Sequence, residues 1–495
     1  MINRNVLIAA VAAVGLGAVS YGIISNTCPP VEAQPSTKAI PLGTAPPSVK
    51  AVPQGTAAPQ SMNQVQLSFA PVVKRIAPAV VNVYARSIVR QQVNPLFADP
   101  LFQQFFGVSP EFRQRVQQSL GSGVIVRSDG VIITNRHVIE NGQDIVVALS
   151  DKREFKARIL LSDSRTDLAV LKIDTHGEHL PTIQFGDSDR VQVGDLVLAI
   201  GDPFGIGQTV TMGIVSALAR TQISQNDYQL FLQTDAAINP GNSGGALVTT
   251  DGKLAGINTA IVSRTGEYSG VGFAIPANLA RRVVEGALGG GGFRLPWIGA
   301  SGQAVTSDLA QSLGLGRPGG VLLKSVYPGG PMANAGVHTG DVVLAIDNAN
   351  VDDMQSLNYH IATHKPGDAV KLRVRSGASA RDVEVKLTVP PENPPRDATT
   401  IGGRNPLTGA KVENLSPAVA TELQMDLMAR GVVVVTSGQS IAAQQGFQPG
   451  DIIRAVNGSE IRSVDQLKNA LANAGGQWNM IIDRGGQRLT LSVEG

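Results

Sequence analysis

Cysteine is almost absent from this chain of 495 residues, which has only Cys28 near its N-terminus. One cysteine cannot close an intramolecular disulfide or build a zinc–cysteine cluster. Aromatic residues make up only 4% of the sequence, whereas 55 glycines and 29 prolines are present. This composition is typical of short strands joined by tight turns and disfavours long helices. A disulfide scaffold is therefore excluded, and we expect no bound metal and no cofactor.

An excess of either charge is also missing, since 41 Lys and Arg residues and 39 Asp and Glu residues give a net charge of +2. Such a balance provides no electrostatic basis for binding nucleic acid or a charged membrane surface. Long apolar runs are missing too, apart from one near the N-terminus, which excludes a polytopic membrane protein. The length predicts roughly three domains.

The one apolar run extends from Val6 to Ile24, follows Arg4 and precedes a polar, proline-rich stretch. This order is typical of a secretory signal. The run is also nearly long enough to span a bilayer, so residues 1–28 are either a cleaved signal peptide or an uncleaved anchor. Residues 29–61 are rich in Pro, Ala, Ser and Gln and predict an extended linker. We therefore expect an exported chain that meets the membrane only through its N-terminal segment.

Short runs of β-branched residues separated by Gly, Asp and Ser turns fill residues 62–289. Their spacing predicts strands that follow one another directly, as in a β-barrel or a β-sandwich. Apolar residues at helical spacing then extend from Asn278 to Leu288, and glycines follow at positions 289–292. These glycines predict a flexible joint at the end of the first domain.

Two copies of one module make up the C-terminal part of the chain. The segment from Gly340 to Asp347 aligns with that from Gly450 to Asn457 at an offset of 110 residues. A period of this length indicates duplicated domains. Prolines repeated between residues 390 and 395 separate the copies, because proline fits neither a helix interior nor a central strand. The expected bounds are residues 293–390 and 403–495 for the modules and 391–402 for the linker.

The sharpest local signal is a serine between glycines, in Gly241-Asn242-Ser243-Gly244-Gly245. Such a serine can stand on a tight turn with neighbouring backbone N–H groups directed at one oxygen. The segment also satisfies the G-x-S-x-G pattern of α/β-hydrolases. That fold needs a helix after the serine, whereas residues 246–257 predict a strand, a turn and a strand. Every later histidine lies in the duplicated modules, so the chain order disfavours an α/β-hydrolase.

His137 is the candidate base, because it follows a buried strand while the two other histidines before Ser243 lie in polar sequence. Asp167 comes 30 residues later, directly before another buried strand. Asp163 is a weaker alternative in the same loop, since it does not adjoin that strand. The order His, Asp, Ser is that of chymotrypsin. Each residue alone is more often structural, but the three in this order favour catalysis.

These residues predict a division of roles. Ser243 is expected to be the nucleophile, His137 the general base and then acid, and Asp167 the group that fixes the imidazole tautomer. The N–H groups of Gly241 and Ser243, on either side of Asn242, would receive the oxyanion.

Four segments in order resemble the HtrA (Do/Deg) serine proteases: Thr134 to Val138, Thr166 to Val170, Gly201 to Gly205 and Thr234 to Gly245. The resemblance covers nearly all of the chain after residue 62. It implies a mainly β fold, with a chymotrypsin-like double β-barrel followed by two PDZ domains. Arg136 and Asp202 depart from it, because many members have a small or an amide residue there. These departures leave the triad intact but alter the rim of the site.

The same resemblance implies an endopeptidase of protein quality control in the bacterial periplasm, soluble or tethered to the inner membrane. Its expected substrates are unfolded proteins, and its expected assembly is a homotrimer or a multiple of one. The Phe-rich insertion at residues 94–107 would be a regulatory loop, or else a satellite hydrophobic cluster. The alternative function is a holdase or PDZ scaffold with an inactive protease domain.

Specificity can also be predicted. The residue six positions before the nucleophile lies at the bottom of the S1 pocket in a chymotrypsin-like fold, and here it is Ala237, beside Ile238. No carboxylate is present for Lys or Arg, so cleavage should follow small or medium aliphatic residues.

The modules also have candidate binding loops. The PDZ resemblance implies that Trp297-Ile298-Gly299-Ala300 holds the carboxylate of a C-terminal peptide, and that Leu407-Thr408-Gly409-Ala410 has the corresponding place in the second module. A purely structural role for both modules is the alternative.

Overall fold

The computed structural model describes residues 68–90, 114–140, 142, 144–203, 207–220, 230–239, 241–259, 270–290 and 292–494. The predicted signal segment at 1–28, the linker at 29–61 and the insertion at 94–107 lie outside these residues. No helix in the described ranges is long and apolar enough to cross a membrane.

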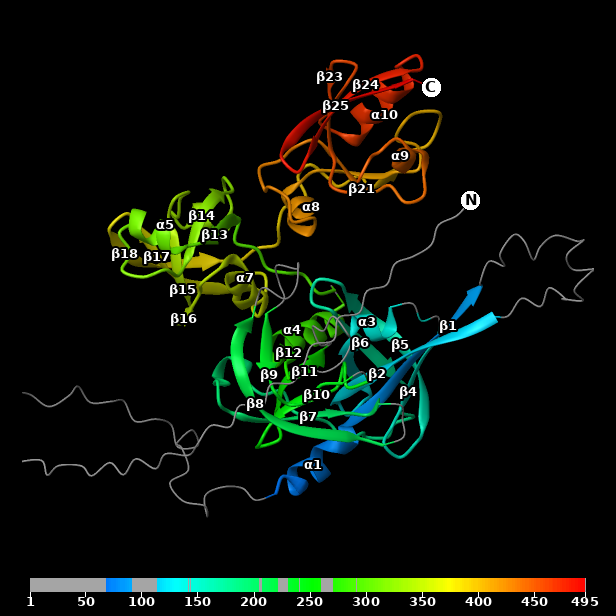
Figure 1. Ribbon diagram of the computed structural model, residues 1–495, viewed down its shortest axis with the longest axis vertical. Coiled ribbons are helices and arrows are strands. Elements are labelled where there is room, and N and C mark those ends of the chain that lie inside the picture. Colours follow the sequence, from blue (N-terminus) through cyan, green and yellow to red (C-terminus); the bar gives the residue numbers. More distant parts are fainter. Residues whose placement is uncertain are drawn as a thin grey trace, which may run out of the picture. The chain divides into compact units, whose positions relative to one another are not determined.

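Six strands close the first barrel in the order β1-β2-β3-β6-β5-β4. Their bounds are β1 Val80–Arg90, β2 Gln114–Arg127, β3 Val131–Asn135, β4 Asp144–Ala148, β5 Glu154–Asp163 and β6 Leu168–Ile173. β1 and β2 pair antiparallel along the long blue and cyan ribbon in Figure 1. Short helical segments accompany the barrel: α1 Ala70–Ile76, η2 Ala77–Ala79 and α3 Arg136–Ile139.

A second barrel has the order β10-β11-β12-β9-β8-β7. Its strands are β7 Leu196–Gly201, β8 Thr209–Arg220, β9 Phe231–Thr234, β10 Ala246–Thr249, β11 Leu254–Thr259 and β12 Gly272–Pro276, with η4 Ser188–Arg190 before them and α4 Ala277–Leu288 after them. The expected double β-barrel is thus confirmed, and α4 lies where the apolar periodicity predicts a helix.

Aliphatic side chains fill the barrels. Every residue of β3 and of β12 is buried, so these strands contact apolar neighbours on both faces. Leu279 and Val283 of α4 are fully buried in the same cluster as the first barrel. Complete burial of such a side chain stabilises the fold by about 1.5–3 kcal/mol. The barrels therefore form a rigid support for the loops at their rims.

The first C-terminal module contains a sheet in the order β13-β14-β15-β17-β18, with β16 paired to β15. Its elements are β13 Ala300–Ala304, α5 Ser307–Ser312, β14 Val321–Val326, α6 Pro331–Asn334, β15 Val342–Ile346, β16 Ala349–Asn350, α7 Met354–Ala362, β17 Ala369–Ser376 and β18 Ser379–Lys386. Asp353 caps α7 through a capping box with Ser356. The strand β13 is an edge of this sheet within the described residues.

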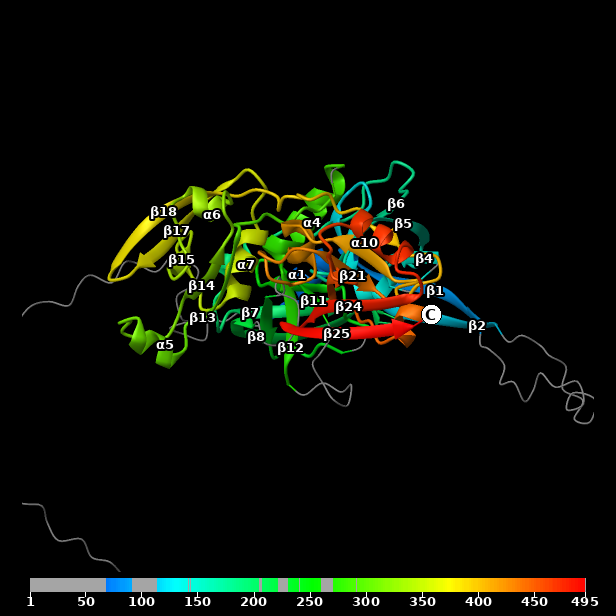
Figure 2. The same cartoon turned by 90° about the horizontal axis from the view of Figure 1, so that it is seen from above.

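The second module repeats this plan and adds one strand, in the order β19-β20-β21-β22-β24-β25. Its elements are β19 Thr399–Thr400, β20 Lys411–Asn414, α8 Pro417–Glu422, β21 Val432–Thr436, α9 Ile441–Gln444, β22 Ile452–Val456, β23 Ser459–Glu460, α10 Val464–Ala472, β24 Gln477–Arg484 and β25 Gln487–Glu494. The antiparallel pair β24 and β25 is the long red hairpin in Figure 2. The segment expected to be only a linker thus contains β19.

Side-chain hydrogen bonds join the first module to the barrel domain, in addition to the glycine joint that the sequence predicts at 289–292. Tyr359 of α7 is only 2% exposed, and its hydroxyl donates to Asp189 Oδ1 at 3.3 Å. Burial raises the pKa of this hydroxyl, so it stays protonated as a donor. Arg282 of α4 donates from Nε to the carbonyl of His364 at 3.1 Å. The first module is therefore held to the barrels by more than the chain connection.

Candidate active site

His137 and Asp167 form a close pair at the rim of the first barrel. His137 lies in α3, which follows β3 directly, and the buried neighbours Val138 and Ile139 anchor this short helix in the core. Its Nδ1 lies 2.7 Å from Asp167 Oδ2, and its backbone N–H donates to Oδ1 at 3.1 Å. One carboxylate thus orients both the ring and the backbone of the histidine.

The conformation of Asp167 is itself constrained. Its φ of 55° lies in the left-handed region, directly before β6. Its carbonyl accepts from the backbone N–H of Arg136 at 2.9 Å and from Asn135 Nδ2 at 3.2 Å. Thr259, at the end of β11 in the second barrel, donates to Oδ2 at 3.5 Å. These contacts hold the carboxylate against His137.

Asp163, the weaker candidate, has other partners. Its buried carboxylate accepts from Arg165 Nη2 at 2.6 Å and from the backbone N–H of Thr166 at 3.2 Å. No hydrogen bond joins it to His137 within the described residues. The structure therefore places Asp167, and not Asp163, beside the imidazole.

Ser243 stands on a turn whose glycines are needed for its shape. Gly241 and Gly244 have φ values of 97° and 84°, which side chains disfavour. Gly121 of β2 lies between this turn and the segment that contains His137. A Cβ at Gly121 would lie 2.6 Å from Val138 Cγ2 and 3.0 Å from the carbonyl oxygen of Ser243. The two segments therefore pack against one small residue, which brings Ser243 to the side of the His137 turn.

The backbone N–H groups of this turn divide into two sets. Those of Asn242, Gly244 and Gly245 donate to the carbonyls of Asn239, Asn258 and Asn242, at 3.0, 2.8 and 2.9 Å. Those of Gly241 and Ser243 have no acceptor among the described residues. Two free donors flanking one residue are the arrangement that stabilises an oxyanion.

Ser122 of β2, which no sequence motif marks, contacts both ends of the serine turn. This fully buried residue donates from Oγ to the carbonyl of Gly241 at 2.6 Å and from its backbone N–H to the carbonyl of Ser243 at 2.7 Å. Its own carbonyl accepts from Thr134 Oγ1 at 2.7 Å. The local signal for Ser122 in the sequence is its position between Gly121 and Gly123, which allows close backbone approach.

A second buried group lies beside the turn. Asp202 follows β7, is 4% exposed, and donates from its backbone N–H to Ser122 Oγ at 2.8 Å. Burial raises the pKa of its carboxyl, against a smaller opposing effect of the Gly207 N–H. Its Oδ1 and both polar side-chain atoms of Asn242 have no partner among the described residues. The departure at Asp202 thus places an acidic group where it is costly to ionise.

The predicted S1 residues differ in exposure. Ala237 is partly exposed, and its carbonyl accepts from Thr211 Oγ1 at 2.8 Å. Ile238 is 1% exposed and belongs to the core of the second barrel. The side chain of Ile238 therefore packs into the core of the second barrel, next to the more exposed Ala237.

The predicted loop of the first module precedes the edge strand β13. Trp297 and Ile298 are buried, Gly299 has a φ of 72°, and Ala300 begins the strand. The N–H groups of Ile298 and Gly299 have no acceptor among the described residues. The Trp297 indole packs edge-on against Tyr327, at 5.5 Å between ring centroids. The backbone of this loop, rather than its indole, is thus available to an anion.

Family comparisons agree with this architecture. The profile of the trypsin-like peptidase domain matches residues 121–257, and PDZ domain profiles match residues 296–387 and 434–484. Fold and matched domains together define a trypsin-like peptidase that carries two PDZ domains.

Individual relatives narrow this class. The chain is 39% identical over 394 residues to a protein of Chlamydia trachomatis serovar D named as a probable periplasmic serine endoprotease, DegP-like, with 78% of each chain covered. It is 38% identical over 414 residues to a Marinomonas protein of the same name, covering 81% of this chain and 87% of that one. The solved HtrA-type protease AlgW with a decapeptide is 44% identical, with a TM-score of 0.50, over 66% of this chain and 99% of that one. The chain therefore belongs to the HtrA family of DegP-like serine endoproteases, as its motifs predict.

Proposed function

We propose that this serine endoprotease acts in protein quality control, cleaving misfolded or unfolded proteins after small or medium aliphatic residues. The observation that carries the proposal is the His137–Asp167 pair beside a glycine turn that presents Ser243 and two free N–H groups. Intact folded proteins bury their aliphatic residues, so a preference for such residues selects unfolded chains.

In the proposed mechanism, Ser243 Oγ attacks the scissile carbonyl while its proton passes to His137 Nε2. Asp167, at 2.7 Å from Nδ1, keeps that nitrogen protonated and stabilises the imidazolium that forms. The N–H groups of Gly241 and Ser243 bind the oxyanion, with Asn242 between them. His137 then protonates the leaving amine, and water hydrolyses the acyl-enzyme by the same route in reverse.

Specificity is proposed to come from Ala237, with Ile238 behind it. A small uncharged residue at the bottom of S1 leaves room for an aliphatic side chain and supplies no carboxylate for Lys or Arg. The expected readout is cleavage after Val, Ala, Ile or Leu in a peptide library. Preferred cleavage after Arg would contradict this assignment.

Regulation is proposed to act through the first PDZ module. Its backbone N–H groups at Ile298 and Gly299 would hold the carboxylate of a C-terminal peptide, which extends along β13. A peptide that binds one arrangement of the enzyme better than another shifts the resting and active populations. Amidation of its C-terminus removes the anion and should abolish activation.

Export and assembly complete the proposal. Residues 1–28 would direct the chain to the periplasm, either cleaved or retained as an anchor, and the folded part would assemble as a trimer or a multiple of one. The intact mass of the exported protein distinguishes cleavage from anchoring. Light scattering of a chain beginning near residue 62 tests assembly, and a monomeric mass at micromolar concentration would contradict the trimer.

The deciding experiment is degradation of casein by the wild type and by Ser243→Ala. Loss of the nucleophile should lower the rate by about 10⁴- to 10⁶-fold. Equal turnover by both proteins would refute the catalytic assignment. Protection of an unfolded protein from aggregation by both, without cleavage by either, would favour the holdase alternative.

A further inference from the structure

The two PDZ modules differ at the sheet edge where a peptide would add. In the first module β13 has no strand on its outer side within the described residues. In the second, β19 pairs antiparallel with β20, the counterpart of β13, joining Thr399 to Val412 and Thr400 to Lys411. The chain before the second module thus occupies the edge that is open in the first.

We call residues 395–401 the strap, and its backbone follows β20 from end to end. At one end, the N–H of Asn414 donates to the carbonyl of Arg396 at 2.7 Å. At the other end, the N–H of Ile401 donates to the carbonyl of Ala410 at 2.8 Å. An extended, antiparallel segment with main-chain hydrogen bonds to a sheet edge is how strand-adding peptides bind.

The strap also enters the loop that would hold a carboxylate. Gly409 is the counterpart of Gly299 at the offset of 110 residues. Its N–H donates to the carbonyl of Ile401 at 2.7 Å, whereas that of Gly299 has no acceptor among the described residues. The carbonyl of Ile401 therefore occupies the position of a ligand's terminal oxygen.

The side chain of Ile401 behaves as the apolar terminal residue of a ligand would. It is 4% exposed and belongs to the cluster that contains Leu407, Leu467 and Leu471, the last two from α10. In the first module, Ile298, Leu357 and Ile361 form the corresponding apolar cluster, the last two from α7. The strap thus satisfies both the polar and the apolar requirement of the groove.

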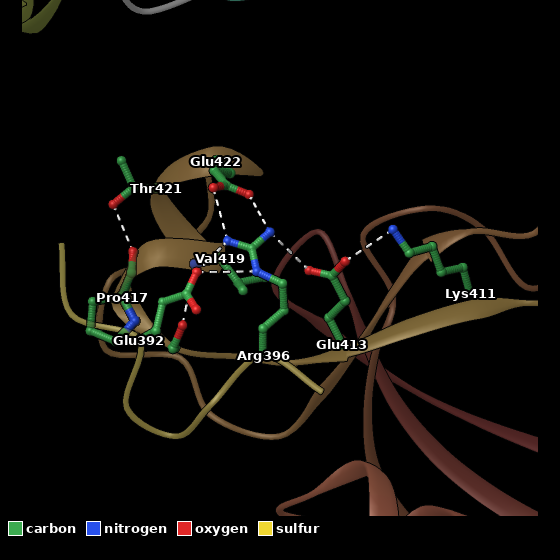
Figure 3. A network of polar contacts seen from close by, with 9 residues as sticks. Glu392, Arg396, Lys411, Glu413, Pro417, Val419, Thr421 and Glu422 are labelled. Carbon is green, nitrogen blue, oxygen red and sulfur yellow. Dashed lines mark hydrogen bonds and ion pairs between the residues drawn. The ribbon is translucent and has the colours of Figure 1, made fainter. Parts of the chain in front are cut away.

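An ion-pair network holds the strap in place, as Figure 3 shows around Arg396. This guanidinium makes two bonds to Glu422 of α8, at 2.7 and 2.9 Å, and two to Glu392, at 2.8 and 3.3 Å. Glu413 of β20, whose side chain is 5% exposed, lies 3.4 Å from it and is also paired with Lys411. Hydrogen bonds to Glu422 raise the pKa of Arg396, so it stays charged. Bidentate pairs of this kind fix geometry as well as adding attraction.

We propose that the strap is an internal ligand of the second PDZ module, so that this module accepts a C-terminal peptide only after the strap is displaced. The first module is then the open peptide receptor of the chain. This inference goes beyond the proposed function and does not depend on the catalytic triad, because it concerns backbone pairing within the second module.

Hydrogen exchange of the full chain carrying Ser243→Ala tests the strap without any ligand. The amide of Gly409 should exchange about 100-fold more slowly than that of its counterpart Gly299, because only Gly409 has an intramolecular acceptor. The probe peptide is a decapeptide with an apolar C-terminal residue and a free carboxylate. Its addition should protect residues 298–304 and leave residues 407–414 unchanged. Equal exchange of the two glycines, or new protection at 407–414, would overturn the proposal.

A strap-release variant, Arg396→Ala with Ile401→Ala, tests the same point by binding. The wild-type strap should allow one peptide per chain, and release should allow a second, with new protection at residues 407–414. Arg462→Ala with Ile441→Ala is the matched control, since Arg462 forms an exposed pair and Ile441 is 46% exposed. A folded release variant that still binds a single peptide would refute the inference. If that variant does not fold, the exchange at Gly409 in the parent chain still decides.

The outcomes separate this inference from the proposed function. A peptide that protects neither module contradicts peptide binding by the first module, while slow exchange at Gly409 would still support the strap. Fast exchange at Gly409 with normal protection of residues 298–304 contradicts the strap alone.

Discussion

The two barrels share one plan of six antiparallel strands, yet they bring different groups to the candidate active site. The first supplies His137 and Asp167, whose positions follow from buried strand ends and a left-handed backbone. The second supplies Ser243 and the free N–H groups, whose positions follow from a glycine turn. One apolar cluster is shared by both barrels and a second lies in the second barrel alone, but apolar packing has no preferred direction and does not orient polar groups. The hydrogen bonds that cross from one barrel to the other therefore orient these groups relative to one another.

Those crossing contacts are polar and buried. Ser122 binds the carbonyls of Gly241 and Ser243 and accepts from the N–H of Asp202. Asn82 of β1 donates from Nδ2 to the carbonyl of Asp202 at 2.7 Å. Because unpaired buried polar groups are costly, these bonds favour one placement of the two barrels relative to each other.

The largest effect is expected from removing the negative charge of Asp167, which the first barrel supplies. Asp167→Asn should lower kcat by about 10⁴-fold, because an amide favours the wrong imidazole tautomer. Kinetics on a chromogenic peptide measure this. Asp163→Asn is the matched control, since Asp163 binds Arg165 and Thr166 instead of the histidine. It should keep kcat within about twofold and lower stability by about 1–2 kcal/mol. An equal loss of kcat in both variants would contradict the assignment of Asp167.

A smaller effect should follow from cutting the contact between the barrels. Ser122→Ala removes the donor to the Gly241 carbonyl while keeping the backbone bond to Ser243. We expect kcat to fall about 10- to 100-fold with KM within about twofold, because the oxyanion donors lose their fixed direction but substrate contacts remain. Ser150→Ala, in an exposed turn, is the control. A rise in KM at constant kcat would contradict a role in positioning the oxyanion donors.

The smallest effect is expected at Asp202, the acidic residue after β7 at which this chain departs from the pattern of many family members. Asp202→Asn should raise the free energy of unfolding by about 1 kcal/mol at neutral pH, since a buried carboxyl that is costly to ionise is replaced by a neutral amide. The pKa of Asp202 is raised by burial, so the folded wild type binds its proton more tightly than the unfolded chain. The advantage of Asn should therefore shrink as the pH falls through that raised pKa. Urea unfolding at several pH values measures it, and a gain that grows in acid would contradict the account.

Much of this site could be predicted from the sequence, because its candidate catalytic side chains lie at strand ends or in a glycine turn. His137 and Asp167 adjoin apolar runs, and Ser243 lies between glycines, so residue type and position both carry the signal. Adjacency to a strand favours Asp167 over Asp163, and the contacts of the two carboxylates agree with this prediction.

Other features have no comparable signal. The pairing of β19 with β20 involves two residues and backbone bonds, and backbone bonds leave no residue pattern in a proline-rich segment. Ser122 is polar and fully buried, and its partners in the serine turn, Gly241 and Ser243, lie more than a hundred positions away. Ile238, which the sequence places at S1, lies between β9 and β10 with its side chain in the core of the second barrel. Long-range partners of this kind depend on the closed barrels.

The most direct test of the catalytic account is labelling with a fluorophosphonate probe, followed by peptide mapping. The account predicts displacement of fluoride by Ser243 Oγ and a single adduct at that residue. Labelling of His137→Ala should be slower by at least about 10³-fold, because no base accepts the proton. An adduct on another residue, or equal labelling rates in the folded wild type and His137→Ala, would contradict the central claim.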